Sequence, residues 1–458
     1  MDIRRNRAET RGTPWFALAV ATLAAVAAAI APARGAERDA VRAFYFGNSL
    51  LENATPGMHP LLGESAGKKW VYGTAGAAGV PAWVHMNRMM DPQNKHSLRW
   101  NAFENPEAMV VQLFAGPGLS HVTTEMWGNT KFDKPLDVGD VNSCAYLIDR
   151  LLQRNPQGRA YIYTPWAPLP GVKEVRERVA REMEESLKRK GMQRDEIMKY
   201  IKETDAFEEE LDPLRKAFDY EAAWLTTDYI FDAATVQERE RFKKYSSGLR
   251  TLKNNATIAS LAQAAGVPED KLKADMERLR ITEEDLNENA GDGSFFGQFV
   301  NGWPHTHSRA HAWAVMKALT ERYPEMWKQK RLGIIPAGDV FLEIDRRIKA
   351  GDMPGLVSAG EFICNGVHIR GGLPRYTVAA TFYAVLFEAD PHELDWKPFD
   401  DRENYEKSKE RFGEYVHMPD VGVLLDITPE RAKTVNDAIW EVVTHHPYVP
   451  FSDAYGSQ

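Results

Sequence analysis

The chain has 458 residues, of which 43% are hydrophobic and 27% are charged. This balance is typical of a soluble globular protein and excludes a largely disordered one. The length suits one enlarged domain, or a core that carries an insertion. The formal net charge is −8, and no stretch of Lys and Arg offers the basic surface that a nucleic-acid partner requires. We therefore expect no nucleic-acid partner.

The first 36 residues predict an export signal. Arginines between Arg4 and Arg11 precede an apolar run over 15–30, and small residues follow over 31–36. This order is typical of a secretory signal peptide, and the apolar run is shorter than the roughly 20 residues that span a bilayer. We expect a periplasmic or secreted protein. An uncleaved N-terminal membrane anchor is the alternative.

Short apolar runs predict four buried strands, over 41–46, 108–114, 159–163 and 332–336. A helix is predicted over 141–153, because its apolar residues recur at helical spacing. Strands that alternate with helices form a parallel sheet covered on both faces. The predicted fold class is therefore α/β, a three-layer α/β/α sandwich with a mostly parallel sheet.

A helical insertion is predicted over 171–301, where charged residues are dense. Within it, Gly266 ends one helix and Pro268 begins the next. Charged runs of this kind are usually solvated faces, so we interpret the insertion as a lid or a packing subdomain. The α/β domain then comprises 37–170 and 302–458. Its C-terminal extension includes a helix capped by Thr428.

Neither the cysteines nor a cluster of histidines predicts a metal site. Cys144 and Cys364 are far apart and form no C-x-x-C pair; we expect two buried free thiols, with a disulfide as the alternative. His307 and His311 would share one face of a helix, which is a metal-ligand spacing. No acidic residue lies within 303–311, and exposed histidines at a helix start, or contacts to substrate, explain the cluster as well. We expect no metal or cofactor.

Ser49 is the candidate nucleophile. It follows the first predicted strand in Gly47-Asn48-Ser49-Leu50, where a turn leads into a helix. Open α/β sheets bind ligands at the carboxyl ends of their strands. Backbone N–H groups at such a turn can stabilise an oxyanion. A helix cap is the alternative role for this serine.

His368 is the candidate general base. It lies between Gly366 and the pair Gly371-Gly372, ahead of a helix predicted over 376–383. A loop of this kind can expose the imidazole, which a base requires. A purely structural histidine is the alternative.

Together these segments resemble the SGNH, or GDSL-like, hydrolase superfamily, in its exported bacterial members. Gly47-Asn48-Ser49-Leu50 stands in place of the family's Gly-Asp-Ser-Leu-like block, and Asn365-Gly366-Val367-His368 in place of its Asp-x-x-His block. The resemblance covers roughly 41–166 and 330–445. It implies Ser49, His368 and Asn365 as the catalytic set, and a small-molecule or glycan ester, such as an O-acetylated carbohydrate, as substrate.

The resemblance also implies an oxyanion hole. Its donors would be the backbone N–H groups of Ser49 and Gly76, with Gly79 as the alternative to Gly76. Its third donor is normally an Asn amide after the second buried strand, and Gln112 is the nearest amide there. A plain turn at the glycines, and a structural role for Gln112, are the alternatives.

Asn365 departs from the family pattern, because the family normally has an acid there. An amide can orient the imidazole but cannot stabilise its protonated form by charge. In a serine protease the corresponding Asp→Asn change lowers turnover about 10⁴-fold. Two functions are therefore expected: a serine esterase, in which Ser49 and His368 can act as a dyad, or a non-catalytic glycan-binding protein that has kept the cleft.

Overall fold

The computed structural model describes residues 37–76, 79–113, 139–193, 196, 208–226, 236–252, 255–279, 281–283, 286, 307–364, 366–405, 407 and 424–457. The chain divides into one unit of residues 1–36 and one of residues 37–458. The predicted export signal lies outside the described residues. Within the described ranges, no helix combines the length and the apolar character needed to cross a membrane.

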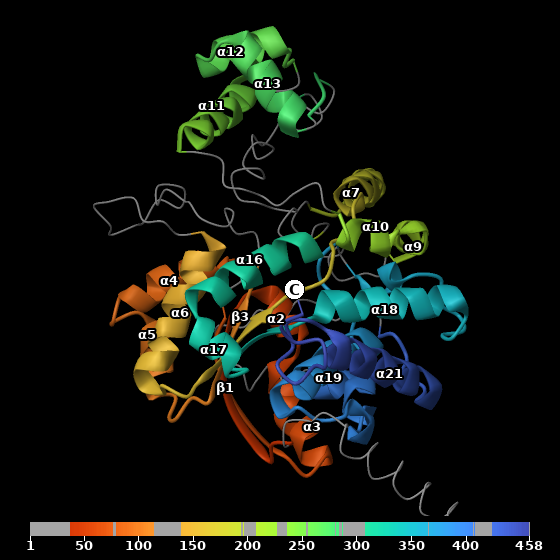
Figure 1. The fold of residues 1–458 in the computed structure, drawn as a ribbon. Helices are drawn as coiled ribbons and strands as arrows, with labels where there is room; N and C mark the ends of the chain where they lie inside the picture. The colour runs from red at the N-terminus through yellow and green to blue at the C-terminus, as the bar shows by residue number, and fades with distance from the viewer. Residues whose placement is uncertain are drawn as a thin grey trace, which may run out of the picture. The chain divides into compact units, whose positions relative to one another are not determined.

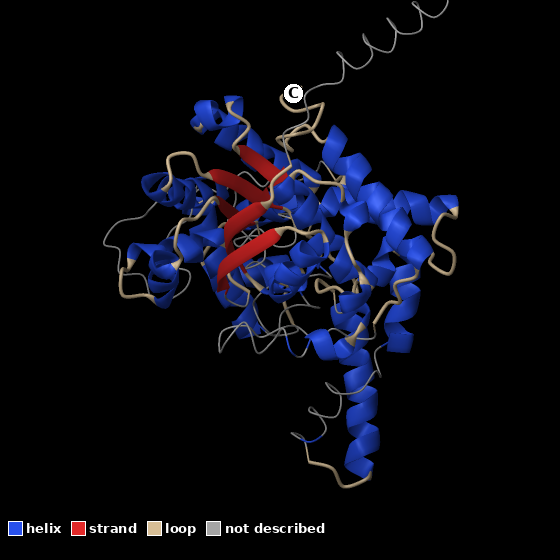
Figure 2. Ribbon diagram, turned by 90° about the horizontal axis from the view of Figure 1, so that it is seen from below, coloured by secondary structure: helices blue, strands red, loops and turns tan. Residues whose placement is uncertain are grey.

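One parallel sheet of five strands lies at the centre of the described residues, in the order β2-β1-β3-β4-β5 (Figure 2). The strands are β1 (Ala40–Gly47), β2 (Lys69–Gly76), β3 (Ala108–Gln112), β4 (Arg159–Tyr163) and β5 (Leu332–Ile335). All four predicted strands are confirmed, as β1, β3, β4 and β5. The order is that of flavodoxin-like doubly wound sheets, which reverses between β1 and β3.

Strand β2 was not among the predicted strands. It is an edge strand with glycines inside it, and glycine weakens a strand interior. Gly73 is required there by packing, because an added Cβ would lie 2.7 Å from ring atoms of both Phe44 and Phe103. The aromatic residues that fill this space belong to other parts of the chain, so the local sequence gives a weak strand signal.

Helices cover both faces of the sheet, which confirms the three-layer α/β/α sandwich (Figure 1). One face carries α4 (Ala82–Met90), α5 (Lys95–Ala102), α6 (Asp140–Arg154), α16 (Arg309–Arg322) and α17 (Pro324–Lys328). The other carries α3 (His59–Ser65), α18 (Ala337–Ala350), α19 (Leu373–Phe387) and α21 (Pro429–His445). Short elements complete the domain: α2 (Ser49–Asn53) and the 3₁₀ turns Pro56–Met58, Ala359–Phe362, Pro391–Glu393 and Lys397–Asp400.

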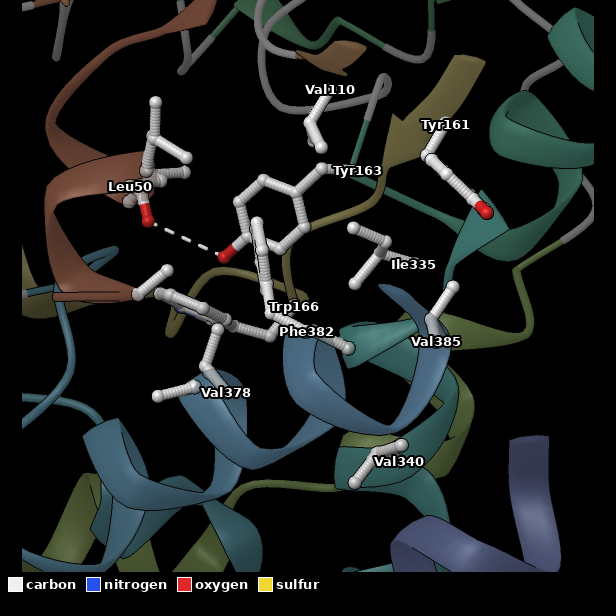
Figure 3. Packing of buried hydrophobic residues seen from close by; sticks show 14 of the residues in the cluster. Leu50, Val110, Tyr161, Tyr163, Trp166, Ile335, Val340, Val378, Phe382 and Val385 are labelled. Atoms are coloured by element: carbon white, nitrogen blue, oxygen red, sulfur yellow. Dashed lines mark hydrogen bonds between the residues drawn. The ribbon is translucent and has the colours of Figure 1, made fainter. Parts of the chain in front are cut away.

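Helix α19 is the most deeply buried helix of the described chain, with every residue from Leu373 to Phe387 buried. It packs against the sheet and against α21. Figure 3 shows part of this core, in which the ring of Phe382 on α19 meets that of Tyr163 on β4, with ring centroids 4.8 Å apart. The loop that precedes α19 is therefore attached to a rigid element.

The predicted insertion is helical where it is described, and its helices fall into two groups. The first comprises α7 (Val172–Arg189), α9 (Glu208–Ala217) and α10 (Tyr220–Trp224), whose apolar side chains belong to the main hydrophobic cluster. The second comprises α11 (Val236–Leu252), α12 (Ile258–Ala265) and α13 (Glu269–Leu279), which enclose a separate hydrophobic cluster. The first group is thus part of the main core and not only a solvated cover.

Several local predictions are confirmed. Gly266 follows the end of α12 with a φ of +61°, a left-handed conformation that glycine adopts without strain. Thr428 caps α21, because its side chain accepts a hydrogen bond from the Arg431 backbone N–H at 3.2 Å. Cys144 and Cys364 are both buried, and they are not joined by a disulfide.

Candidate active site

Ser49 and His368 are in direct contact. His368 Nε2 lies 2.9 Å from Ser49 Oγ, although 319 positions separate the two residues in the chain. Both residues are partly exposed. A hydroxyl within hydrogen-bond reach of an imidazole is the arrangement of a nucleophile with its general base. The expected contact is confirmed.

The sheet topology places this pair where doubly wound folds bind ligands. Ser49 is the first residue of α2, and a single residue, Asn48, separates it from the carboxyl end of β1. Strand order reverses between β1 and β3, and ligands of open α/β sheets bind beyond the carboxyl ends of the strands at such a reversal. As the first residue of α2, Ser49 also has a backbone N–H with no acceptor inside its own helix.

The turn that presents Ser49 is built around the buried side chain of Asn48. Asn48 Oδ1 accepts from the Leu50 backbone N–H at 2.9 Å, and Asn48 Nδ2 donates to the Val80 carbonyl at 3.2 Å. Gly47 precedes it with no space for a side chain, because an added Cβ would lie 2.6 Å from the Cβ of Leu51. The turn is therefore fixed by an Asx-type cap and by close packing.

Gln112 holds the same turn from the end of β3. Its Oε1 accepts from the Asn48 backbone N–H at 3.1 Å, and its Nε2 donates to Asn48 Oδ1 at 2.7 Å. One N–H of the Gln112 amide is therefore engaged, and only the second can serve an oxyanion. Its oxyanion role stays a prediction, while its contact with Asn48 gives it a positioning role.

Gly76 is placed beside the same turn. It is the last residue of β2 and pairs in register with Gly47. An added Cβ at Gly76 would lie 3.8 Å from Glu52 Oε1 and 3.9 Å from the Gly47 carbonyl oxygen. Gly79, the alternative donor, follows in the left-handed region with a φ of +65°. The oxyanion role of Gly76 stays a prediction.

Helix α2 is anchored at both of its ends. Tyr163 Oη donates to the Leu50 carbonyl at 3.3 Å, as Figure 3 shows. At the last residue of α2, Asn53 Oδ1 accepts from the Ile369 backbone N–H at 2.9 Å. Asn53 therefore links the helix that begins with Ser49 directly to the loop that carries His368.

That loop is closed by backbone hydrogen bonds of its own. The Cys364 N–H donates to the His368 carbonyl at 2.8 Å, and the Arg370 N–H donates to the Phe362 carbonyl at 2.9 Å. Gly366 adopts a φ of +91°, which glycine tolerates without steric cost. Asn365, predicted to orient the imidazole, lies outside the described residues.

Glu52 is a buried acid one turn after Ser49. Its side chain is almost fully buried, and neither carboxyl oxygen has a hydrogen-bond partner within the described part of the chain. Burial raises the pKa of the Glu52 carboxyl to about 8, and the nearby Arg375 guanidinium opposes this only in part. Glu52 is therefore protonated, and neutral, at pH 7.

The predicted histidine cluster is buried and has structural partners. His311 Nε2 lies 2.8 Å from Asp140 Oδ2, and neither side chain is exposed. His307 Nδ1 lies 3.2 Å from the Trp166 carbonyl oxygen, and burial lowers the pKa of His307 to about 4. The expectation that a helix start would expose these two histidines is wrong. His311, in the first turn of α16, contacts Asp140 of α6, and His307, which precedes α16, contacts the loop between β4 and α7.

No group of three or more His, Cys, Asp or Glu side chains that could hold a metal occurs among the described residues. The acid that pairs with His311 is Asp140, which lies 171 positions away and was not foreseen. Glu52 and Asn53 were also not predicted. Their only signal is that two polar residues follow the apolar pair Leu50-Leu51.

Comparisons with known proteins do not assign a family. No family model matches the chain, and no curated protein matches it. A solved structure of a DUF4886 family protein from Bacteroides uniformis is 11% identical and aligns over 88% of this chain and 95% of that chain, with a TM-score of 0.35. A TM-score this low carries no argument about function.

Proposed function

We propose that the protein is an exported serine esterase of the SGNH type. The observation that supports this proposal is the 2.9 Å contact between Ser49 Oγ and His368 Nε2, made by two partly exposed residues at the carboxyl edge of the sheet. The resemblance of the Gly47-Asn48-Ser49-Leu50 and Asn365-Gly366-Val367-His368 segments to the family's two catalytic blocks also supports it.

The reaction is ester hydrolysis in two steps. Ser49 Oγ attacks the acyl carbon while His368 Nε2 takes its proton, and the protonated imidazole then returns that proton to the departing alcohol. Water, deprotonated by the same imidazole, releases the acid from the acyl-serine and restores the hydroxyl. The backbone N–H groups of Ser49 and Gly76 stabilise the oxyanion of each tetrahedral intermediate.

The substrate class that the resemblance suggests is an O-acetylated carbohydrate or a small acyl ester. The predicted signal peptide places the reaction in the periplasm or outside the cell. The chemistry needs no metal and no cofactor, because the nucleophile, the base and the oxyanion donors are all side chains or backbone of this chain.

A second candidate function is a non-catalytic glycan-binding protein. It is favoured by one observation, the amide of Asn365 where the family normally has an acid. Without that charge the protonated imidazole is less stable, so turnover falls. Esterase activity then depends on Ser49 and His368 acting as a dyad.

Hydrolysis of p-nitrophenyl acetate distinguishes the two functions. We expect Ser49→Ala and His368→Gln each to lower kcat/KM by at least about 10³-fold, with Ser457→Ala, an exposed serine near the C-terminus, as the matched control. A fluorophosphonate is expected to label wild-type protein at Ser49 and not the Ser49→Ala variant.

Equal hydrolysis by wild type and Ser49→Ala would contradict the esterase. Binding of an acetylated oligosaccharide without release of acetate would then favour the glycan-binding function. The variant Asn365→Asp refines the test, since a large gain in kcat would identify the natural protein as an attenuated enzyme.

A further inference from the structure

Arg215 reaches the histidine loop from the insertion. It lies on α9 and its side chain is fully buried. Its Nε donates to the Ile363 carbonyl at 2.7 Å, and its Nη2 donates to the Cys364 carbonyl at 2.7 Å. These two carbonyls immediately precede the segment 365–368, which ends at the proposed base.

Other carbonyls of the same loop are also held by donors. The Leu169 backbone N–H donates to the Gly366 carbonyl at 2.7 Å, and Trp166 Nε1 donates to the Val367 carbonyl at 2.7 Å. Both donors lie in the loop between β4 and α7. Among these donors Arg215 alone carries a charge, and it alone comes from the insertion.

The backbone of Arg215 is fixed as tightly as its guanidinium. Ser358 Oγ donates to the Arg215 carbonyl at 2.7 Å. An added Cβ at Gly360 would lie 2.2 Å from the Arg215 carbonyl oxygen, so α9 approaches the 3₁₀ turn Ala359–Phe362 backbone to backbone. The guanidinium therefore projects from a rigid position, and it can restrain the loop rather than follow it.

A guanidinium is suited to this task. Its planar fork presents two parallel N–H donors to two adjacent carbonyl oxygens, whereas an ammonium offers a single point of attachment. Loss of the guanidinium would leave these two buried carbonyls without their charged donor, which is unfavourable and favours rearrangement of the loop. Displacing a catalytic group by about 1 Å can lower the rate about 10²-fold.

We propose that Arg215 is a positioning residue for His368, so that the insertion contributes a necessary part of the active site. Through the carbonyls of Ile363 and Cys364, Arg215 holds the loop in the conformation that places His368 Nε2 against Ser49 Oγ. This inference rests on the proposed esterase function.

The test compares Arg215→Met and Arg215→Lys with wild type, using p-nitrophenyl acetate. We expect Arg215→Met to lower kcat by about 10- to 100-fold, with KM within about 3-fold of wild type, because substrate contacts are not removed. Arg215→Lys should recover part of kcat. The matched control is Arg178→Met, which removes an exposed arginine of α7 that pairs with Glu210 and should leave kcat unchanged.

Hydrogen exchange of the peptide that covers 363–369 gives a readout that does not depend on turnover. We expect faster exchange in Arg215→Met than in wild type, confined to this loop and α9. The proposal would be overturned if Arg215→Met had the kcat and the exchange rate of wild type. If Arg215→Met does not fold, the same two measurements on Arg215→Lys test the proposal. Equal hydrolysis by wild type and Ser49→Ala would overturn the esterase function; exchange at 363–369 then still decides whether Arg215 holds the loop.

Discussion

Gln112 and Asn48 hold each other through two hydrogen bonds, one in each direction between the Gln112 amide and the residue that precedes Ser49. The pair spans 64 positions of sequence and joins the ends of the neighbouring strands β1 and β3. Both side chains are buried. The conformation of the nucleophile turn therefore depends on a residue of another strand.

We expect Gln112→Leu to lower both stability and activity. The substitution removes two buried hydrogen bonds and leaves the Asn48 backbone N–H without its acceptor, at a cost of about 1–3 kcal/mol, whereas Asn48 Oδ1 keeps the Leu50 N–H as a donor. Thermal unfolding and p-nitrophenyl acetate hydrolysis measure the two effects. Gln153→Leu, on the exposed end of α6, is the control, and equal behaviour of the two variants would contradict the role assigned to Gln112.

The two glycines that face each other across β1 and β2 should respond differently to alanine. An added Cβ at Gly47 lies within 2.7 Å of both Leu51 Cβ and Gln112 Oε1, whereas at Gly76 the nearest atom is 3.7 Å away. We expect Gly47→Ala to lower the free energy of unfolding by about 1–3 kcal/mol through overpacking. Gly76→Ala should remain close to wild type in melting temperature. A Gly76→Ala variant as unstable as Gly47→Ala would contradict this packing.

Glu52→Gln should change how stability depends on pH. The folded carboxyl has a pKa of about 8 against 4.5 in the unfolded chain, so between these values folded protein keeps a proton that unfolded protein releases. Stability contributed by this group is complete below about pH 4.5 and declines by up to about 1.4 kcal/mol per pH unit as the pH rises toward 8. Gln cannot ionise, so the variant should lack this decline.

Urea unfolding at pH values from 4 to 9 measures the difference. Wild type and Glu52→Gln should be closest in free energy of unfolding at pH 4. As the pH rises, the free energy of unfolding of wild type should fall relative to that of the variant. Glu64→Gln changes an exposed carboxyl on α3 and serves as the control. Parallel curves for wild type and Glu52→Gln would show that Glu52 is ionised in the folded protein at neutral pH.

Asp140→Ala should destabilise the fold without implicating a metal. The substitution leaves the buried His311 Nε2 without its 2.8 Å hydrogen-bond partner, and a buried polar group that loses its partner costs about 1–3 kcal/mol. We expect a clearly lower melting temperature, which Asp453→Ala at an exposed position does not reproduce. Dialysis of wild type against EDTA should leave the melting temperature unchanged, and a large drop would instead indicate a metal near His311.

The fold was predictable where the signal is local. Strands β1, β3, β4 and β5 are short apolar runs, and the cap of α21 lies in adjacent residues of the sequence. Strand β2 was missed because its conformation depends on Phe44 and Phe103, which occupy the space left by Gly73. Long-range packing of this kind leaves no periodic pattern in the strand itself.

Three side chains of the candidate site, those of Ser49, His368 and Gln112, were predictable from the sequence. Ser49 follows a strand end and His368 lies among glycines, and both are features of the nearby sequence. Arg215 carries no such signal, because its partners lie 148 and 149 positions away and its segment looks like any charged, solvated helix. Its proposed positioning role rests on complete burial and on these two hydrogen bonds, which only the folded chain establishes.

The separate hydrophobic cluster of α11, α12 and α13 has a consequence for cooperativity. Apolar contacts couple residues within one core, so two clusters without shared members can melt as two units. The smaller one, with eleven buried residues from Phe242 to Leu286, would open at a lower temperature while the Ser49 turn and the His368 loop stay intact. Heat would then unfold α11, α12 and α13 before it disrupts the contact between Ser49 and His368.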